Sequence, residues 1–342
     1  MANLAPPPTG GAMPAATSSK RIAVTGAAGF FGSALLPRLL GGRYERILAL
    51  DIREPSFRDH GITYRRIDLT HPTVDQTLLE LFRSFEIDTV VHTAFLSEPA
   101  HQSSWAHELE AIGTLQVLNA CAEHGVRKVV LLSSTVVYGP HPENPNYLCE
   151  SHPLRGLPGS RYVQDRVEAE RQLQRFKREN PQVICASARL APVVGPTVRN
   201  WVTRYLSFPM PLRLLGYDPL LQCLHETDAI DALTLLVDRD CDGPWNIVAD
   251  GVLPLSRALE ACGRLSLPVP EPVARVYVEA LWTAQLLNLP PTFLRFLRYL
   301  CVADGTRAQE ELGFTPRYGT VEALHTFAQA RGLNAARGRK AA

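Results

Sequence analysis

The sequence lacks a surplus of either charge: 35 lysines and arginines face 34 aspartates and glutamates, for a formal net charge of +1. Such a chain has no general attraction for phosphate backbones, so we expect no nucleic-acid partner. It also lacks an apolar run long enough to cross a bilayer, because charged or proline residues interrupt the longest candidates, and we expect no membrane span. The interrupting residues are Glu279, Pro290, Arg295 and Arg298.

Cysteine is present but never in a C-x-x-C pair. The seven cysteines are scattered and odd in number. This argues against a zinc site or a disulfide framework and for a reducing, cytoplasmic compartment, so no metal ligands are expected. Residues 1–19 lack the basic start and apolar run of a secretory signal, and their Pro, Ala, Gly and Ser content predicts a disordered leader. The basic residues of 331–342 predict a flexible tail.

Short apolar and β-branched runs alternate with longer amphipathic stretches over the first half of the chain. This alternation predicts βαβ units and hence an α/β fold, a doubly wound parallel sheet of Rossmann type. The runs expected to be strands are 21–25, 47–50, 88–92, 128–133 and 183–190, and the stretches expected to be helices are 30–40, 104–124 and 162–177. Pro37 falls inside the first of these helices and predicts a kink.

After Pro192 the predicted elements become shorter and proline becomes more frequent. This change predicts a smaller lobe that covers the carboxyl edge of the sheet. We therefore expect a Rossmann domain formed by 20–190 and about 221–250, and a substrate lobe formed by about 191–220 and 251–330.

Gly26, Gly29 and Gly32 lie between the first predicted strand and the first predicted helix. Gly26 permits a tight turn, Gly29 lets the backbone approach a pyrophosphate, and Gly32 allows close packing of the helix against the strand. The free N–H groups at the start of the helix would then face the phosphates. Asp51 ends the second strand, 19 positions after Gly32, where a carboxylate binds ribose hydroxyls and repels a 2′-phosphate. The pattern predicts NAD, with NADP as the second choice because Arg53 could bind that phosphate.

Further motifs follow in a fixed order along the chain. Besides the glycines they are Asp68-Leu69, His92-Thr93-Ala94, Gly113-Thr114, the segment from Ser133 to Gly139, the segment from Arg189 to Pro196, and the segment from His225 to Asp228. Together they resemble the extended short-chain dehydrogenase/reductase family, in its branch of NAD-dependent sugar epimerases and dehydratases such as UDP-glucose 4-epimerase. The resemblance runs from about residue 20 to about residue 327.

The resemblance implies a cofactor-binding set drawn from the glycine loop and the ends of several strands. These residues are Gly26, Gly29, Phe30, Phe31, Gly32, Asp51, Ile52, Arg53, Asp68, Leu69, Thr93, Ala94 and Pro192.

The resemblance also implies a catalytic group of a hydroxyl, a tyrosine and a cation. Ser134 would orient the substrate alcohol and Tyr162 would be the acid/base. The family places a lysine where this chain has Arg166, and an asparagine at about the position of Glu110, two departures that put efficient catalysis in doubt. We hypothesise that Glu110 and Arg166 form an ion pair, which would weaken the lowering of the Tyr162 pKa. The alternative is that Glu110 points to solvent.

The substrate side of the resemblance is less complete. Val136 and Val137 stand where the dehydratases carry an acid pair, which argues against water elimination. Pro192 and Leu221 stand where an asparagine and an arginine contact a sugar diphosphate, although lobe arginines could replace that charge. Those arginines are Arg199, Arg204 and Arg213.

Apolar stretches at 276–282 and 293–297 either form the core of the lobe or line a greasy substrate pocket, as in the similar 3β-hydroxysteroid dehydrogenases. A third alternative is an interfacial helix over about 292–300, with Arg295 and Arg298 extending to the membrane surface.

Three functions stay open at this point. The first is a NAD-dependent oxidoreductase or epimerase that acts on a secondary alcohol of a small, nucleotide-sugar-like substrate. The second is a 3β-hydroxysteroid-dehydrogenase-like enzyme for an apolar alcohol, and the third is a catalytically impaired NAD-binding regulatory module. Family members also form homodimers through helices around Gly113 and Arg166, and the apolar Leu115, Val117 and Leu118 permit that contact here.

Overall fold

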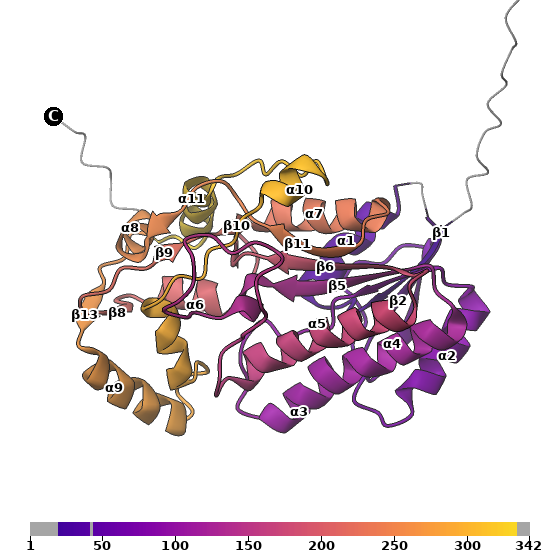
Figure 1. Ribbon diagram of the computed structural model, residues 1–342, viewed down its shortest axis with the longest axis horizontal. Coiled ribbons are helices and arrows are strands. Elements are labelled where there is room, and N and C mark those ends of the chain that lie inside the picture. Colours follow the sequence, from indigo (N-terminus) through magenta and orange to yellow (C-terminus); the bar gives the residue numbers. More distant parts are fainter. Residues whose placement is uncertain (1–19, 42–43, 334–342) are drawn as a thin grey trace, which may run out of the picture.

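The computed structural model describes residues 20–41 and 44–333. Within them the central feature is a seven-stranded sheet with the order β11-β6-β5-β4-β1-β2-β3, in which every neighbouring pair is parallel (Figure 1). The order reverses between β1 and β4, which is the switch point where doubly wound sheets bind ligands. The strands are β1 Lys20–Thr25, β2 Tyr44–Asp51, β3 Ile62–Arg66, β4 Thr89–His92, β5 Lys128–Ser134, β6 Ile184–Leu190 and β11 Gly243–Ile247. The predicted Rossmann sheet is confirmed.

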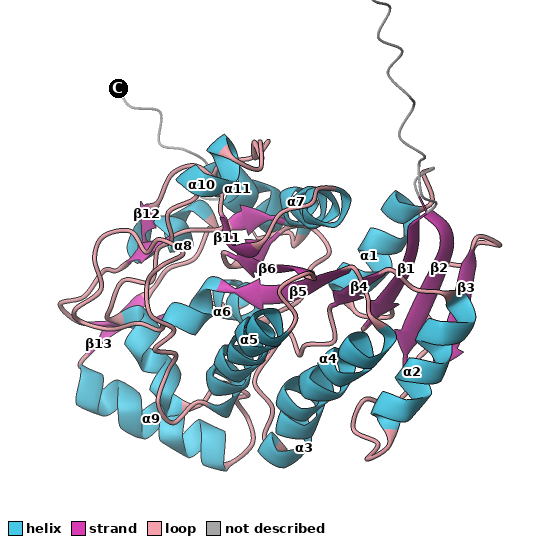
Figure 2. Cartoon of the chain, turned by 45° about the vertical axis from the view of Figure 1, so that its right-hand side comes forward, coloured by secondary structure: helices cyan, strands magenta, loops and turns pink. Residues whose placement is uncertain are grey.

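Helices cover both faces of the sheet, with α1 and α7 on one face and α2, α4 and α5 on the other (Figure 2). A hydrophobic core lies on each face of the sheet, and successive strand residues point into one core or the other. Ile22 and Val24 pack on the α1 side, and Ala23 packs on the α4 side. Because both faces are covered, the central strands β4, β5 and β6 are buried along almost their whole length. These helices are α1 Phe30–Leu39, α2 Val74–Phe85, α4 Gly113–His124, α5 Arg161–Glu179 and α7 Glu226–Asp238.

The predicted helix 104–124 has the expected extent but not a uniform geometry. It comprises α3 Ser103–His107, a π-helical turn η1 Glu108–Ile112, and α4. Such π turns often occur at functional sites. Val117 and Leu118 of this helix are buried in the core below the sheet, which corrects the expectation that they are available for a dimer contact. A homodimer stays a prediction.

Short elements build a lobe beyond the carboxyl ends of the strands (Figure 1). Three two-stranded pairs, β7 with β10, β9 with β12 and β8 with β13, and the packing of α6, α8 and α11 hold it together. The remaining elements are η2 Thr135–Tyr138, β7 Val193–Val194, α6 Trp201–Ser207, β8 Leu212–Leu214, β9 Leu220–Leu221, β10 Leu224–His225, β12 Leu253–Pro254, α8 Leu255–Ala261, β13 Leu267–Val269, α9 Glu271–Thr283, η3 Pro291–Leu297, α10 Thr306–Glu310 and α11 Thr320–Ala330.

The chain returns to the sheet through α7 and β11, between two passages through the lobe. The domain boundaries themselves stay a prediction. The predicted leader 1–19 and most of the predicted tail lie outside the described residues, but the tail does not begin at 331: the Arg331 side chain donates a hydrogen bond to the Val198 carbonyl, 2.9 Å away. No described helix combines the length and the apolar character that a membrane crossing needs.

Candidate active site

The glycine loop between β1 and α1 is shaped by close backbone contacts. Gly26 has a φ of +71°, and a Cβ there would lie 2.6 Å from the Ala94 amide nitrogen. A Cβ on Gly32 would lie 2.2 Å from the Gly26 carbonyl oxygen, so Gly32 allows close packing against the turn itself, not only against the strand as expected. Gly29 is different, because its Cβ would approach only the Gly26 oxygen, at 3.1 Å. Gly29 therefore leaves the start of α1 bare.

The carboxylate of Asp51 faces this loop from the end of β2. It accepts hydrogen bonds from the Ala28 and Arg53 amides, both at 3.0 Å, and each oxygen keeps a lone pair for a further donor. Ile52 is 47% exposed, and Arg53 is exposed at the rim of a cavity. The loop and the Asp51 carboxylate are thus adjacent, and ribose binding by Asp51 stays a prediction.

The other predicted adenine-side residues lie after β3. Asp68 is exposed, and hydrogen bonds from the Thr70 hydroxyl and amide lower its pKa. Leu69 is buried against Gly113, where a Cβ would come within 3.2 Å of the Leu69 side chain. These two residues lie outside the cavity described next.

A cavity of about 360 Å³ opens at the carboxyl ends of β1, β4, β5 and β6. It joins the glycine loop to the predicted catalytic residues, because both groups line it. The predicted residues in its wall are Gly29, Phe30, Phe31, Arg53, Thr93, Ser134, Tyr162, Arg166 and Pro192. The predicted residues that lie outside its wall are Gly26, Gly32, Asp51, Ile52, Asp68, Leu69 and Ala94.

The sequence did not indicate several other wall residues. Leu96 and Ser97 come from the loop after β4, and Asn200 and Trp201 come from the start of α6. Asn200 caps that helix: its side chain accepts a hydrogen bond from the Thr203 amide, and the Thr203 hydroxyl accepts one from the Asn200 amide. The capping pattern Asn-x-x-Thr was a readable signal for the helix start. The same pattern does not indicate that the start of α6 faces the cavity.

Ser134 and Tyr162 approach the cavity from β5 and α5. Ser134 ends β5, and its hydroxyl accepts a long hydrogen bond of 3.4 Å from the Val136 amide. The Tyr162 hydroxyl donates to the Ser97 carbonyl at 3.4 Å, which is also a long contact. These two hydrogen bonds are long, and the Trp201 side chain makes a further hydrogen bond to the Tyr162 hydroxyl. The catalytic roles of Ser134 and Tyr162 stay a prediction.

Arg166 lies one helical turn beyond Tyr162, and its guanidinium is fully engaged. Its central carbon lies 3.8 Å from the centre of the Tyr162 ring, and one nitrogen donates to the Tyr162 carbonyl at 3.0 Å. The same nitrogen, Nη1, is 3.1 Å from Glu110 Oε2, and Nη2 donates to the Leu96 carbonyl. The cation thus stacks on the phenol ring and does not reach past it.

The hypothesised ion pair between Glu110 and Arg166 is present. Glu110 is fully buried and Arg166 is 6% exposed. The second carboxylate oxygen of Glu110 accepts a hydrogen bond from the Leu96 amide at 2.6 Å. The π turn η1 carries Glu110, and the alternative that Glu110 points to solvent is wrong.

The electrostatics follow from burial and this pairing. Burial raises the pKa of Tyr162 to about 12; Arg166 acts to lower that pKa, while Glu110 acts to raise it. Burial likewise raises the pKa of Glu110 to about 7, against the opposing pull of Arg166. Because burial outweighs the effect of Arg166, Tyr162 stays protonated at neutral pH.

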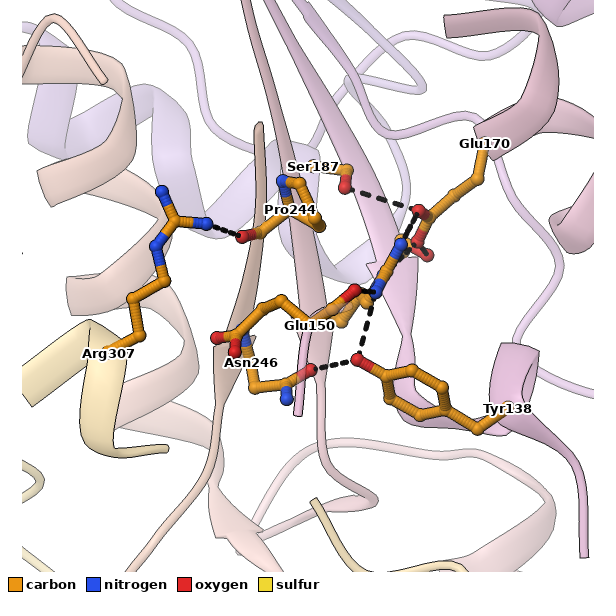
Figure 3. Close-up of polar contacts among 9 residues, drawn as sticks. Tyr138, Glu150, Glu170, Ser187, Pro244, Asn246 and Arg307 are labelled. Carbon is orange, nitrogen blue, oxygen red and sulfur yellow. Dashed lines mark hydrogen bonds and ion pairs between the residues drawn. The ribbon is translucent and has the colours of Figure 1, made fainter. Parts of the chain in front are cut away.

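A buried polar network lies behind the cavity and joins β5, β6, β11 and α5. Arg189 is its centre: it pairs with Glu170 at 2.6 Å and donates to the Tyr138 hydroxyl at 2.9 Å. Glu170 also accepts from the Ser133 hydroxyl, and the Tyr138 hydroxyl donates to Asn246 at 2.7 Å. Figure 3 shows Tyr138, Glu170 and Asn246 converging from separate elements. The network holds the strand end that carries Ser134.

The substrate side of the cavity offers little charge. Arg204 pairs with Glu98 at 3.0 Å, and Arg213 lies 3.8 Å from Asp218. Arg199 lines the cavity, and among the described residues it has no ion-pair partner. One of the three predicted lobe arginines is therefore available to an anionic substrate. Within the same described residues, no cluster of three or more His, Cys, Asp or Glu side chains could hold a metal ion.

Comparison with solved structures supports the fold. The complex of MoeE5 with UDP-glucuronic acid and NAD superposes with a TM-score of 0.66 and 24% identity, covering 91% of this chain and 98% of that one. UDP-glucose 4-epimerase of Thermotoga maritima with UDP-glucose superposes with a TM-score of 0.69 and 18% identity, covering 91% and 98%. At these identities the likeness shows a shared architecture.

Sequence comparison gives the family. An uncharacterised protein of Mycobacterium tuberculosis (strain H37Rv) is 34% identical over 326 residues, which cover 92% of this chain and 85% of that protein. UDP-glucose 4-epimerase of Dictyostelium discoideum is 28% identical over 184 residues, covering 51% of this chain and 52% of that enzyme. The family model described as "NAD dependent epimerase/dehydratase family" matches residues 22–247. The chain belongs to this family.

Proposed function

We propose that the chain is a NAD-dependent oxidoreductase or epimerase that acts on a secondary alcohol of a nucleotide-sugar-like substrate. One observation carries the proposal: a single cavity brings together the bare start of α1 at Gly29 and the hydroxyls of Ser134 and Tyr162. Family membership supports the cofactor and the reaction class.

The residues at the glycine loop fit a dinucleotide. Gly29 has no side chain to cover the start of α1, and only the Gly26 oxygen lies near the place of a Cβ, at 3.1 Å, so the backbone there can lie against a pyrophosphate. The first N–H groups of α1, from Phe30 onward, have no partner within the helix and can donate to phosphate oxygens. Asp51 can accept hydrogen bonds from ribose hydroxyls. When bound, NAD would supply the hydride acceptor.

The raised pKa of Tyr162 bears on whether this residue would act as a proton donor or as a proton acceptor. A phenol with a pKa of about 12 donates a proton readily to a forming alkoxide but seldom exists as a phenolate base at neutral pH. Ser134 would hold the substrate oxygen in either direction. Near pH 7, Tyr162 would therefore be present as the phenol that can donate a proton when a ketone is reduced.

Val136 and Val137 are buried at the positions where water elimination needs an acid and a base. A dehydratase is accordingly not proposed. None of the names reported above is that of a steroid enzyme, so the comparisons do not support the 3β-hydroxysteroid alternative.

The test begins with binding and then turnover. NAD and NADP affinities of the purified full chain are measured by calorimetry, and a panel of UDP-sugars and dTDP-sugars is then assayed for oxidation and epimerisation. We expect NAD to bind more tightly than NADP and Tyr162→Phe to bind NAD normally while losing turnover. Failure of the folded chain to bind either dinucleotide would overturn the proposal.

A second candidate function is a NAD-binding module with impaired catalysis. The observation that favours it is the stacked, ion-paired guanidinium of Arg166, whose charge is satisfied by Glu110 and not by the phenol oxygen. The double variant Glu110→Asn, Arg166→Lys tests it. A gain in turnover of about a hundredfold or more would favour the impaired module, since this is the usual size of an acid/base contribution. An unchanged or lower turnover would favour the enzyme.

A further inference from the structure

A second cavity lies in the lobe beside the candidate active site. It has a volume of about 170 Å³ and is bounded by α6, the loop after α6, α9 and η3. Trp201, the first residue of α6, lines this cavity and the candidate active-site cavity as well. The two spaces therefore share a wall.

Aromatic rings form that wall. The Trp201 and Phe293 rings meet edge to face at 5.1 Å, and Phe293 lies 6.1 Å from the Tyr162 ring. Phe293 lines the lobe cavity, and Tyr162 lines the other one. A molecule that presents an alcohol to Tyr162 is thus close enough to extend a side group around Trp201.

The lining of the lobe cavity selects an apolar occupant. Its side chains are aliphatic or aromatic, including Val278, Leu281 and Leu294. The Tyr205 hydroxyl in the wall already donates to the Leu212 carbonyl at 2.9 Å. A buried water needs about two to four polar partners, which such a lining does not offer.

The cavity opens to solvent between the loop after α6 and α9. Phe208, Met210 and Tyr277 form this opening and are 41%, 59% and 57% exposed. Exposed apolar side chains gathered around an apolar cavity are typical of a ligand entrance.

We propose that this cavity is a subsite for one compact apolar group, a single aromatic ring or a short branched alkyl chain, carried by the substrate. The position beside Tyr162 makes this inference rest on the proposed function. Its size supports a single ring, because an apolar cavity of about 150 Å³ binds benzene. The subsite would supply the affinity that the sparse charge on the substrate side does not.

Toluene binding tests the subsite without any need for activity. Titration of the full-length chain with toluene, followed by calorimetry, should show one saturable site. Leu281→Phe fills the cavity and should weaken binding by about tenfold or more. Leu286→Phe is the matched control, because Leu286 is 76% exposed and does not line the cavity, and it should stay within about twofold. If Leu281→Phe does not fold, Val278→Phe narrows the same space.

Two results would overturn the subsite: no saturable toluene binding, or equal binding by wild type and Leu281→Phe. Binding of dodecanol at least about tenfold tighter than toluene would also overturn it, in favour of a long lipid chain. Turnover links the subsite to the substrate: kcat/KM for an aryl-substituted alcohol should fall in Leu281→Phe, while kcat/KM for the unsubstituted alcohol should not. Toluene binding with no turnover of any alcohol would remove the proposed function and not the cavity, and turnover without toluene binding would do the reverse.

Discussion

At the scale of single residues, Arg166 is the side chain that most changes the chemistry of the cavity. A lysine can place a compact charge beside a phenol oxygen, whereas a guanidinium is planar and stacks on the ring. Here the stacking distance is 3.8 Å, and Glu110 and two backbone carbonyls take the donors. The phenol oxygen of Tyr162 consequently gains little stabilisation of its anion.

We predict a steep alkaline dependence for alcohol oxidation. Because ionisation of Tyr162 has a raised pKa of about 12, a base role makes the rate rise about tenfold per pH unit between pH 7 and 9. Initial rates of NADH formation between pH 6 and 10 measure this slope. Replacing Arg166 by Lys together with Glu110 by Asn should move the profile toward lower pH, and the exposed Arg161→Lys should leave it in place. A flat profile in the wild type would rule out Tyr162 as the base.

We predict that Asp51 determines the choice of dinucleotide. Asp51→Asn should weaken NAD binding by about ten- to a hundredfold, since a hydrogen bond to a charged acceptor contributes about 1.5–3 kcal/mol. The preference over NADP should shrink in the same variant, because the repulsion of a 2′-phosphate is removed. Calorimetric titration with both dinucleotides checks this. Arg53→Ala serves as the contrast and should weaken only NADP; loss of NAD binding in that variant would contradict the assignment.

At the scale of elements, two glycines of the same loop have different predicted roles: Gly32 in packing and Gly29 in ligand binding. Gly32→Ala forces its Cβ to within 2.2 Å of the Gly26 oxygen, so we predict a loss of about 1–3 kcal/mol in the free energy of unfolding. Gly29→Ala brings its Cβ to 3.1 Å from the same oxygen, a tight but less severe contact, so it should lose less stability than Gly32→Ala while losing NAD affinity. Gly41→Ala, whose Cβ would lie 3.7 Å from the Arg38 oxygen, is the control for both measurements. Urea unfolding and calorimetry decide; equal stability of Gly32→Ala and Gly41→Ala would refute the packing argument.

The same scale shows what the sequence could predict. The five expected strands and three expected helices are present, because buried β-branched runs and amphipathic periods carry strong signals. Helix α2 was missed although Val74, Leu78 and Phe82 are buried at a spacing of four, which is a readable helical signal. Strand β3 was missed because it lies at the sheet edge, and its residues are only partly buried or exposed. The π turn at Glu110 has no simple sequence signature.

The residues of the candidate site also fall into two groups, those that local sequence motifs predict and those that they do not. The glycine loop, Ser134 and Tyr162 come from motifs at fixed positions on the sheet and were predicted. Trp201 was not, because its place depends on how a lobe segment folds back over the sheet. Local patterns do not determine such long-range contacts.

At the scale of the whole molecule, the Arg189 network fastens the sheet to α5. Arg189 and Glu170 are each 1% exposed, and removal of one partner leaves the other buried charge without its ion pair. We predict that Arg189→Met lowers the free energy of unfolding by about 3–5 kcal/mol. Arg58→Met, which breaks the exposed pair with Glu54, should leave stability nearly unchanged. Chemical denaturation of both variants gives the comparison, and similar losses in the two would contradict a special role for the network.

Glu110 and Arg166 have a consequence for how this branch of the family can diverge. Because both side chains are buried and each neutralises the other, a change at one position alone leaves an unmatched charge beside Tyr162 in the wall of the cavity. A lineage moving between this arrangement and the asparagine–lysine arrangement must therefore alter both positions nearly together. Homologous genes should carry one pair or the other, and mixed pairs should be rare.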